Sequence, residues 1–153
     1  MIKVLFVCHG NICRSPMAEF VLKHMVKERG VEKDFVINSS ATSCEELGNP
    51  VHRGTKNKLY EMGIPCGDHR AIRLKKTDYE KYDYIIAMDK NNLKNIALIV
   101  GDDKEGKVSL LLDFTERKGQ NIADPWYTGN FDKTYKDIEE GCRGFIEKVC
   151  SAL

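Results

Sequence analysis

A segment close to the N-terminus restricts the possible folds of this chain more than any other. Val4–Cys8 is a continuous apolar run, too short for an amphipathic helix, and it predicts a buried strand. Gly10 and Asn11 follow, and these residue types most readily adopt the positive φ that points several amide N–H groups into one concavity. Ser15 suits a helix N-cap and Pro16 the first helical position. The segment therefore predicts a strand, a tight loop and a helix N-terminus, which together attract an anion.

Cys8 and Arg14 lie at the two ends of this loop, with five residues between them. Free amides, a helix N-terminus and a guanidinium all favour the thiolate form of a cysteine. The planar fork of an arginine matches two oxygens of a phosphate group. The pair therefore predicts a nucleophile directed at phosphorus, with the phosphate oxygens already held. The alternative is a buried structural cysteine and a surface arginine, which the agreement of strand, loop and helix start disfavours.

The stretch Cys8–Pro16, with the Ala18-Glu19 that follows, resembles the signature of low-molecular-weight protein tyrosine phosphatases. The resemblance covers nearly the whole chain and includes four further stretches, Ser39–Ser43, His69–Ala71, Tyr82–Asp89 and Asp124–Tyr127. The loop alone is also similar to that of thioredoxin-coupled arsenate reductases and of small protein arginine phosphatases. It therefore indicates the superfamily and leaves the substrate open.

Strand-like and helix-like segments alternate along the chain. Strands are expected at residues 4–8, 35–39, 84–88 and 108–112, and helices at 16–29, 50–62, 90–100 and 131–153, with a short helical turn at 75–81. This alternation predicts an α/β fold, a doubly wound, four-stranded parallel sheet of the Rossmann-like or flavodoxin-like kind, with helices on both faces. Ligands bind beyond the carboxyl ends of such strands, where Cys8 and the phosphate-binding loop lie. No linker or repeat interrupts the pattern, so we expect one domain over residues 1–153.

The overall charge is close to balanced, with 24 Lys and Arg against 23 Asp and Glu. This balance gives no support for attraction to nucleic acid or membranes, so any anion specificity must be local. No apolar run approaches membrane-spanning length, and the first predicted strand leaves no room for a signal peptide. We therefore expect a cytoplasmic protein whose six cysteines are free thiols. No Cys/His cluster has zinc-like spacing, and we expect no metal and no cofactor.

Asp124 is the candidate general acid, because cleavage of a phosphate ester is easier when a proton reaches the leaving oxygen. Pro125 restricts Asp124 to extended conformations and so fixes its direction. An Asp-Pro pair alone is commonly a simple turn, but the resembled family supplies its general acid from the matching loop. The implied mechanism has Cys8 attack phosphorus to give a phosphocysteine, after which Asp124 acts as base on a water. Arg14 and the loop amides hold the phosphate oxygens in both steps.

The resemblance also implies residues that support the loop. The phosphate-binding loop contains His9, Gly10, Asn11, Ile12, Cys13 and Ser15. In the family, an asparagine matching Asn11 is held in a left-handed conformation by hydrogen bonds from positions matching Ser15, Ser39 and His69. His69 is alternatively an ordinary surface histidine. Asp89 either supports the site or caps the next helix. Ile72 stands where the family commonly has an arginine, which puts that arginine's contacts in doubt.

Cys13 lies one residue before Arg14. In the resembled family, a second loop cysteine can form a reversible disulfide with the nucleophile, which implies redox regulation. The alternative is a small apolar residue that fills space under the loop.

The expected walls of the cleft are aromatic on one side and acidic on the other. Trp126 and Tyr127 can form a slot deep enough for phosphotyrosine, from which a shorter phosphoserine would not reach Cys8. Simple packing against the first strand or the last helix is the alternative. Glu45 stands in the variable loop of the resemblance, and an acidic wall there favours substrates with basic flanks. The alternative is that the charge of Glu45 only increases the solubility of the protein.

Hydrolysis of phosphotyrosine is the expected function. The expected partners are phosphotyrosine-containing proteins, with inorganic phosphate or vanadate as inhibitors, and the expected state is a monomer. An arsenate reductase would need two further redox cysteines between Lys75 and Asp89, where the chain has none. In the arginine phosphatase branch, a threonine tends to occupy the position of Ile12. The apolar side chain of Ile12 suits an aromatic ring better than a guanidinium, so this alternative is less favoured. The last alternative is a non-catalytic phosphate-binding module. It is disfavoured because binding alone needs neither an activated cysteine nor an acid.

Overall fold

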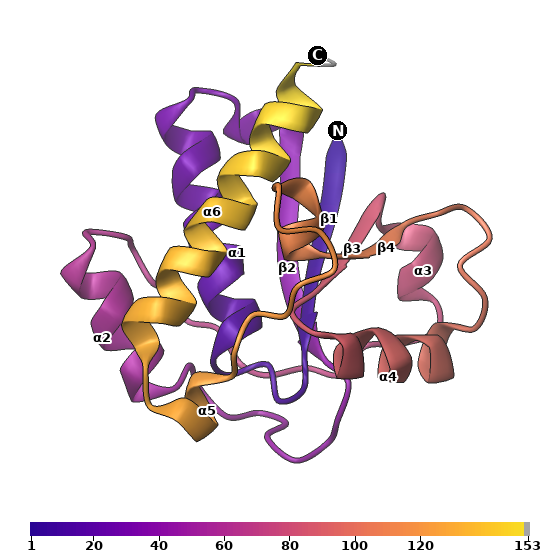
Figure 1. The fold of residues 1–153 in the computed structure, drawn as a ribbon, viewed down its shortest axis with the longest axis horizontal. Coiled ribbons are helices and arrows are strands. Elements are labelled where there is room, and N and C mark those ends of the chain that lie inside the picture. Colours follow the sequence, from indigo (N-terminus) through magenta and orange to yellow (C-terminus); the bar gives the residue numbers. More distant parts are fainter. Residues whose placement is uncertain (152–153) are drawn as a thin grey trace.

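The computed structural model describes residues 1–151, and at its centre lies one sheet of four parallel strands (Figure 1). The strands are β1 (Ile2–Cys8), β2 (Phe35–Ala41), β3 (Tyr84–Ala87) and β4 (Val108–Leu110), in the spatial order β2-β1-β3-β4. At the carboxyl ends of the strands, Cys8 of β1 pairs with Ala41 of β2, and Val7 of β1 pairs with Ala87 of β3. The doubly wound parallel sheet predicted from the alternating pattern is confirmed.

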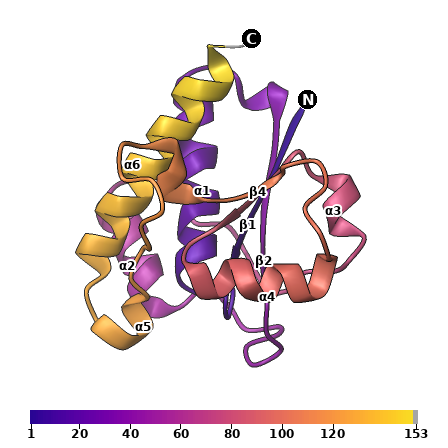
Figure 2. The same ribbon diagram turned by 45° about the vertical axis from the view of Figure 1, so that its right-hand side comes forward.

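Helices cover both faces of the sheet (Figures 1 and 2). They are α1 (Arg14–Glu28), α2 (Arg53–Glu61), α3 (Asp78–Lys81), α4 (Lys90–Val100), α5 (Pro125–Thr128) and α6 (Phe131–Cys150), with short 3-10 turns η1 (Glu32–Asp34) and η2 (Leu111–Phe114). The two longest helices, α1 and α6, lie together on one face, and α3 and α4 lie on the other. None of the helices described here has the length and apolar character needed to cross a membrane.

The first strand is apolar and buried from Val4 to Cys8 because this part is covered on both sides. Val4, Phe6 and Cys8 belong to the core cluster formed with α1 and α6. Leu5 and Val7 alternate with them and pack toward α4 on the opposite face. A central strand of a parallel sheet has this character because helices exclude water from both of its faces.

Helix α6 buries the predicted stripe of one side chain per turn. Tyr135, Ile138, Cys142, Phe145 and Val149 are all buried against the core. Burial raises the pKa of the Cys142 thiol, which therefore stays protonated. The predicted helix continued to residue 153, but α6 ends at Cys150 and Leu153 lies outside the described residues.

The start of α1 corrects one prediction. The helix begins at Arg14 with Cys13 in the N-cap position, and Ser15 and Pro16 already lie inside it. Ser15 does not cap the helix because its hydroxyl contacts Asn11 and Cys8 instead. The residue that looked like a helix signal is therefore part of the loop's own hydrogen bonding.

Other boundaries differ by a few residues, as is usual at element ends. The helix predicted at 50–62 is shorter, since His52 Nδ1 accepts a hydrogen bond from Gly54 N (3.0 Å) and caps it there. The strand predicted at 108–112 ends at Leu110, because Asp113 accepts from Leu110 N (3.0 Å) and turns the chain into η2. The strand predicted at 35–39 extends to residue 41, the one predicted at 84–88 ends at residue 87, and the turn predicted at 75–81 is helical from residue 78.

Gly144 is expected to be essential for the packing of α6 on η2. A Cβ at this position would collide with the backbone carbonyl of Phe114, which cannot rotate away. Gly144→Ala should therefore lower the free energy of unfolding by about 1–3 kcal/mol, although alanine is the better helix former. Urea unfolding measures this change. Glu147→Ala, at an exposed position of the same helix, should stay within about 0.5 kcal/mol of the wild type. Equal stability of both variants would contradict close packing at Gly144.

Candidate active site

The loop between β1 and α1 surrounds the sulfur of Cys8. Cys8 Sγ accepts hydrogen bonds from the backbone N–H of Asn11 (3.3 Å) and of Ser15 (3.4 Å) and lies 3.0 Å from Ser15 Oγ. Cys8 is 3% exposed, yet it lines a pocket. Within the described residues, the amides of Gly10 and Ile12 donate to no protein acceptor. These unpaired donors and the start of α1 can hold an anion in front of the sulfur.

Asn11 gives the loop its shape. Its φ of 59° makes it the one non-glycine residue in the left-handed region among residues 1–151. Its Nδ2 donates to Ser15 Oγ (2.7 Å) and Ser39 Oγ (3.0 Å), while its Oδ1 accepts from Ile72 N (3.1 Å). His69 Nε2 lies 3.2 Å from the backbone oxygen of Asn11. The three predicted partners are therefore in place, but Asn11 donates to the two serines and does not accept from them.

The hydroxyl of Ser15 connects Asn11 with the sulfur. Because Asn11 Nδ2 donates to Ser15 Oγ, one lone pair of that oxygen is occupied. The hydroxyl hydrogen is then free to point at Cys8 Sγ, 3.0 Å away. A hydrogen bond donated to sulfur stabilises negative charge that develops on it, and the Ser15 hydroxyl is placed to make this bond.

Glu19, a buried carboxylate beneath the loop, is not among the site residues predicted from the sequence. Its Oε1 accepts from Ser39 Oγ (2.6 Å) and its Oε2 accepts from Lys23 Nζ (2.6 Å). His69 Nδ1 lies 3.7 Å from Glu19 Oε1, and the His69 side chain is only 9% exposed, so the alternative of a surface histidine is wrong. A glutamate on the buried side of a helix, four residues before a lysine, was the available signal.

Arg14 is 3% exposed, and its guanidinium is fixed on one side. Its Nη1 donates to Asp89 Oδ2 (2.6 Å) and to the carbonyl of Ile122 (2.8 Å). Burial alone would lower the pKa of Arg14, but the charges of Cys8 and Asp89 outweigh it and raise this pKa. Both hydrogens of Nη1 are thereby used, so the edge formed by Nε and Nη2 is the one that can bind two oxygens of an anion, although Nη2 also lies 3.5 Å from Asp124 Oδ2.

Asp89 performs both roles that the sequence left open. Its Oδ2 accepts from Arg14, and its Oδ1 accepts from Asn92 N (2.7 Å) and so caps α4. The hydrogen bonding is reciprocal, because Asn92 Oδ1 accepts a hydrogen bond from Asp89 N (3.2 Å). The capped helix therefore fixes the carboxylate that holds Arg14.

Asp124 approaches Arg14 from the other side. It was predicted in a loop, but it is the N-cap of the one-turn helix α5, with Oδ1 accepting from Trp126 N (3.0 Å). Its Oδ2 lies 3.5 Å from Arg14 Nη2. The preceding segment is held by Ile122 N, which donates to Met88 O (2.8 Å), and by Thr134 Oγ1, which donates to Ala123 O (2.9 Å). One carboxylate oxygen is thus fixed and the other faces the pocket.

These groups line one pocket of about 100 Å³. Its lining is Cys8, His9, Gly10, Ile12, Cys13, Arg14, Glu45, Glu46, Asp124, Trp126 and Tyr127. Trp126 and Tyr127 are 56% and 82% exposed, so the alternative that they only pack against the core is wrong. The ring of His52 supports Trp126 edge-on, with centroids 5.5 Å apart. Glu45 and Glu46 line the same pocket and make part of its wall acidic.

Cys13 lies in the pocket lining but is 5% exposed. It clusters with Ile12 and Ala71, as the alternative of an apolar residue under the loop predicted. Burial, and secondly the charge of Cys8, raise the pKa of the Cys13 thiol to about 12. Cys8 and Cys13 are both free thiols in this structure.

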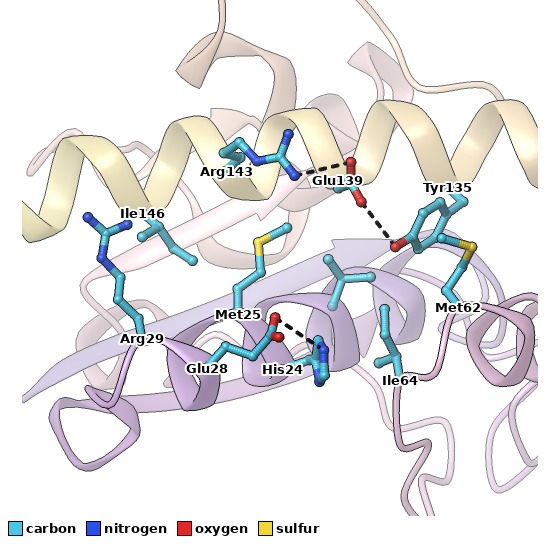
Figure 3. Close-up of a pocket in the computed structure, with 11 residues that line it drawn as sticks. His24, Met25, Glu28, Arg29, Met62, Ile64, Tyr135, Glu139, Arg143 and Ile146 are labelled. Carbon is cyan, nitrogen blue, oxygen red and sulfur yellow. Dashed lines mark hydrogen bonds and ion pairs between the residues drawn. The ribbon is translucent and has the colours of Figure 1, made fainter.

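A larger pocket, of about 540 Å³, lies between α1 and α6 (Figure 3). His24 pairs with Glu28 (3.2 Å) on one of its sides, and Arg143 pairs with Glu139 (3.3 Å) on the other. No cysteine and no residue of the phosphate-binding loop is among its lining residues. The chemistry predicted from the sequence therefore belongs to the smaller pocket.

Comparison with known proteins gives one consistent family. Residues 3–152 match the family model described as low molecular weight phosphotyrosine protein phosphatase. The chain is 36% identical to low molecular weight protein-tyrosine-phosphatase YfkJ of Bacillus subtilis, over 97% of this chain and 96% of that protein. It is 38% identical to PtpA of Staphylococcus epidermidis, a phosphatase of the same description, over 97% and 94%.

Solved structures agree with this result. The crystal structure of YfkJ matches with a TM-score of 0.95 over 99% of this chain and 96% of that one, at 35% identity. The structure of DARP, described as the drosophila arginine phosphatase, matches with a TM-score of 0.88 over 97% and 98%, at 31% identity. The same fold is therefore found in proteins named for two different phosphorylated residues.

Two substitutions of Asn11 should separate its conformation from its hydrogen bonds. Asn11→Gly keeps an easily adopted positive φ but loses the side-chain bonds, whereas Asn11→Ala loses both. Alanine should therefore be less stable than glycine by about 1 kcal/mol, and both variants should turn over p-nitrophenyl phosphate more slowly than the wild type. Urea unfolding and steady-state rates measure these effects. A glycine variant with wild-type rates would show that the bonds to Ser15, Ser39 and Ile72 do not position the loop.

The raised pKa of Cys13 predicts a loss of stability at high pH. The thiol ionises near pH 9 in the unfolded chain but only near pH 12 in the folded protein, so its contribution is complete below pH 9 and is lost between these values. Over that range the free energy of unfolding should fall by about 1 kcal/mol per pH unit on account of Cys13. Urea unfolding of the wild type and of Cys13→Ala at pH 8 and pH 10 measures the difference, because alanine cannot ionise. If the free energy of unfolding changed equally between pH 8 and pH 10 in the wild type and in Cys13→Ala, folding would not raise the pKa of Cys13.

Proposed function

Because this chain belongs to the low molecular weight phosphotyrosine protein phosphatase family, we propose that its hydrolysis of phosphotyrosine in proteins uses Cys8 as nucleophile, Arg14 as phosphate clamp and Asp124 as general acid and base. The chain is accordingly a protein-tyrosine-phosphatase and a hydrolase. The observation that supports these roles is the convergence of Cys8 Sγ, the open edge of Arg14 and Asp124 Oδ2 on one pocket.

In the first step, the Cys8 thiolate attacks phosphorus in line with the bond to the tyrosine oxygen. An S–P bond forms as the P–O bond breaks, and Asp124 Oδ2 donates its proton to the departing phenol oxygen. The loop amides and the Nε–Nη2 edge of Arg14 hold the equatorial oxygens, whose charge they are already oriented to bind. Asp89 keeps that edge in position through the 2.6 Å ion pair.

In the second step, Asp124 is ionised and accepts a proton from a water that attacks the phosphocysteine. The S–P bond breaks and the electron pair returns to sulfur, so inorganic phosphate leaves and the thiolate is restored. Sulfur is now the leaving group. The Ser15 hydroxyl, 3.0 Å from Cys8 Sγ, stabilises the charge that develops on it.

The wall of the pocket favours an aromatic substrate. Trp126 and Tyr127 can stack on a phenyl ring, and Ile12 offers an apolar surface within the same pocket. A protein arginine phosphatase of this fold is the alternative function, since the similar protein DARP carries that description. Ile12 has no polar group with which to bind a guanidinium, and this supports phosphotyrosine as the substrate.

We further propose that Cys13 protects the nucleophile during oxidation. A peroxide would convert the Cys8 thiolate to a sulfenic acid and release hydroxide, and Cys13 would then displace water from it to form a disulfide. Cys13 must lose its proton in this second reaction. Oxidation of Cys8 removes its negative charge, which is the second cause of the raised pKa of Cys13, and so makes that step easier.

The remaining expectations are also proposals. Inorganic phosphate and vanadate should inhibit by occupying the cradle in front of Cys8. We also expect the six cysteines to stay reduced in a reducing compartment such as the cytoplasm. That the enzyme acts as a monomer, without metal or cofactor, stays a prediction.

The role of Asp124 can be tested through the leaving group. Asp124→Asn keeps the size of the side chain but cannot donate a carboxylic proton, so the first step should slow by about 10²–10⁴ for phosphotyrosine. The loss should be smaller for an aryl phosphate whose phenol leaves readily as an anion. Pre-steady-state release of the phenol measures this step. Equal losses for good and poor leaving groups would show that Asp124 only caps α5.

The substrate can be tested with two peptides of the same sequence, one phosphotyrosyl and one phosphoarginyl. We expect the phosphotyrosyl peptide to have the higher kcat/KM. Faster release of phosphate from the phosphoarginyl peptide would favour the arginine phosphatase function. Cys8→Ser, which keeps the amides and Arg14 but lacks the thiolate, is the control for turnover by any other route.

A further inference from the structure

Apart from Asp124, which lies 3.5 Å from Arg14, the charges that line the active-site pocket are sorted by depth. Arg14, at the bottom, is 3% exposed and is the only lysine or arginine in the lining. Glu45, on the wall, has a side chain that is 69% exposed, and Glu46 beside it is half-buried. A phosphate that reaches the bottom is therefore met by positive charge, while the rest of the substrate passes two carboxylates.

The two carboxylates differ in what already binds them. Glu45 Oε2 lies 3.0 Å from His9 Nε2, so its charge is partly matched when His9 is protonated. Glu46 Oε2 accepts from the neutral amide of Asn49 (2.6 Å), and within residues 1–151 Glu46 has no ion-pair partner. The stem of Glu46 lies over the loop, since a Cβ on Gly10 would be 3.3 Å from Glu46 Cγ. Glu46 is therefore a positioned and unmatched negative charge at the pocket wall.

We propose that Glu45 and Glu46 form an acidic rim that selects phosphotyrosyl peptides with a lysine or arginine next to the phosphotyrosine. This inference rests on the proposed function and specifies the class of substrate. A peptide that brings a phosphate dianion past two carboxylates suffers repulsion, and a basic neighbour adds an attraction to the same carboxylates that offsets this repulsion. Glu46 contributes more than Glu45, because His9 already partners Glu45.

The energies involved set the size of the expected preference. Exposed ion pairs contribute little individually, so two rim carboxylates should give about three- to tenfold in kcat/KM between lysine and glutamate neighbours. Screening by salt acts strongly on exposed charges, and the preference should largely disappear at about 0.5 M salt. The phosphate contacts at the bottom of the pocket are screened less because they are buried.

The test compares phosphotyrosyl peptides that are identical except for lysine, alanine or glutamate on both sides of the phosphotyrosine. In the wild type, kcat/KM should decrease in that order at low salt. In the Glu45→Gln/Glu46→Gln double variant, the ratio of kcat/KM for the lysine peptide to kcat/KM for the glutamate peptide should approach one. Glu46→Gln alone should lower this ratio more than Glu45→Gln alone. Each ratio is measured within one protein preparation, so a partly unfolded variant does not alter it.

Glu32→Gln is the matched control, because Glu32 is exposed in η1 before the start of β2, at the opposite end of that strand from the pocket. It should keep the wild-type ratio. Turnover of all three peptides at equal rates by the wild type would overturn the acidic rim and leave the phosphatase function intact, and so would a preference unchanged in the double variant. Failure of the wild type to hydrolyse any of the peptides or p-nitrophenyl phosphate would overturn the proposed function itself.

Discussion

The buried guanidinium of Arg14 is the constraint on which the rest of the site depends. A charge this far from water is tolerated only when it is paired and its donors are satisfied. Asp89 at the start of α4 and the carbonyl of Ile122 before α5 supply that pairing. The guanidinium therefore joins the end of β3, the phosphate-binding loop and the loop that carries the proposed acid Asp124, called the acid loop below, and these three segments are far apart in the sequence. Loss of any one partner would disturb the positions of the other two.

The parallel sheet explains why these segments meet. β1 and β3 are neighbours and point the same way, so the loops after Cys8 and Ala87 emerge at the same edge. Side chains placed just after each strand then face one another without any long-range connection. Ile122 N bonds to the carbonyl of Met88, so the acid loop continues this edge although it follows no strand directly. Strand direction thus brings Cys8 and Asp89 to one edge, and the bond between Ile122 and Met88 adds Asp124 to it.

Features that repeat along the chain could be predicted from the sequence. The apolar run of β1, the stripe of α6 and the alternation of strands and helices each involve many residues, so local exceptions did not alter the result. Cys8 and Arg14 could be proposed as site residues because the strand, the loop and the helix start around them agree, whereas Asp124 was proposed only because the resemblance supports it. Single-residue signals were less reliable, as Ser15 shows: a serine before a proline suits a helix cap, but this hydroxyl is used by Asn11 and Cys8. Glu19 was missed as a site residue, because only the tertiary structure brings the loop's hydrogen bonds to its carboxylate.

The contact between Ile72 and Asn11 has a consequence for how this surface can vary. Ile72 binds the Asn11 side chain through its backbone N–H, and its own side chain is 56% exposed. Because every residue except proline carries that donor, the loop's support does not depend on which side chain stands at position 72. Isoleucine stands here where the resemblance leads one to expect an arginine, and the bond to Asn11 is present all the same. The outer surface at position 72 can therefore change its chemical character without loss of the bond that supports the loop.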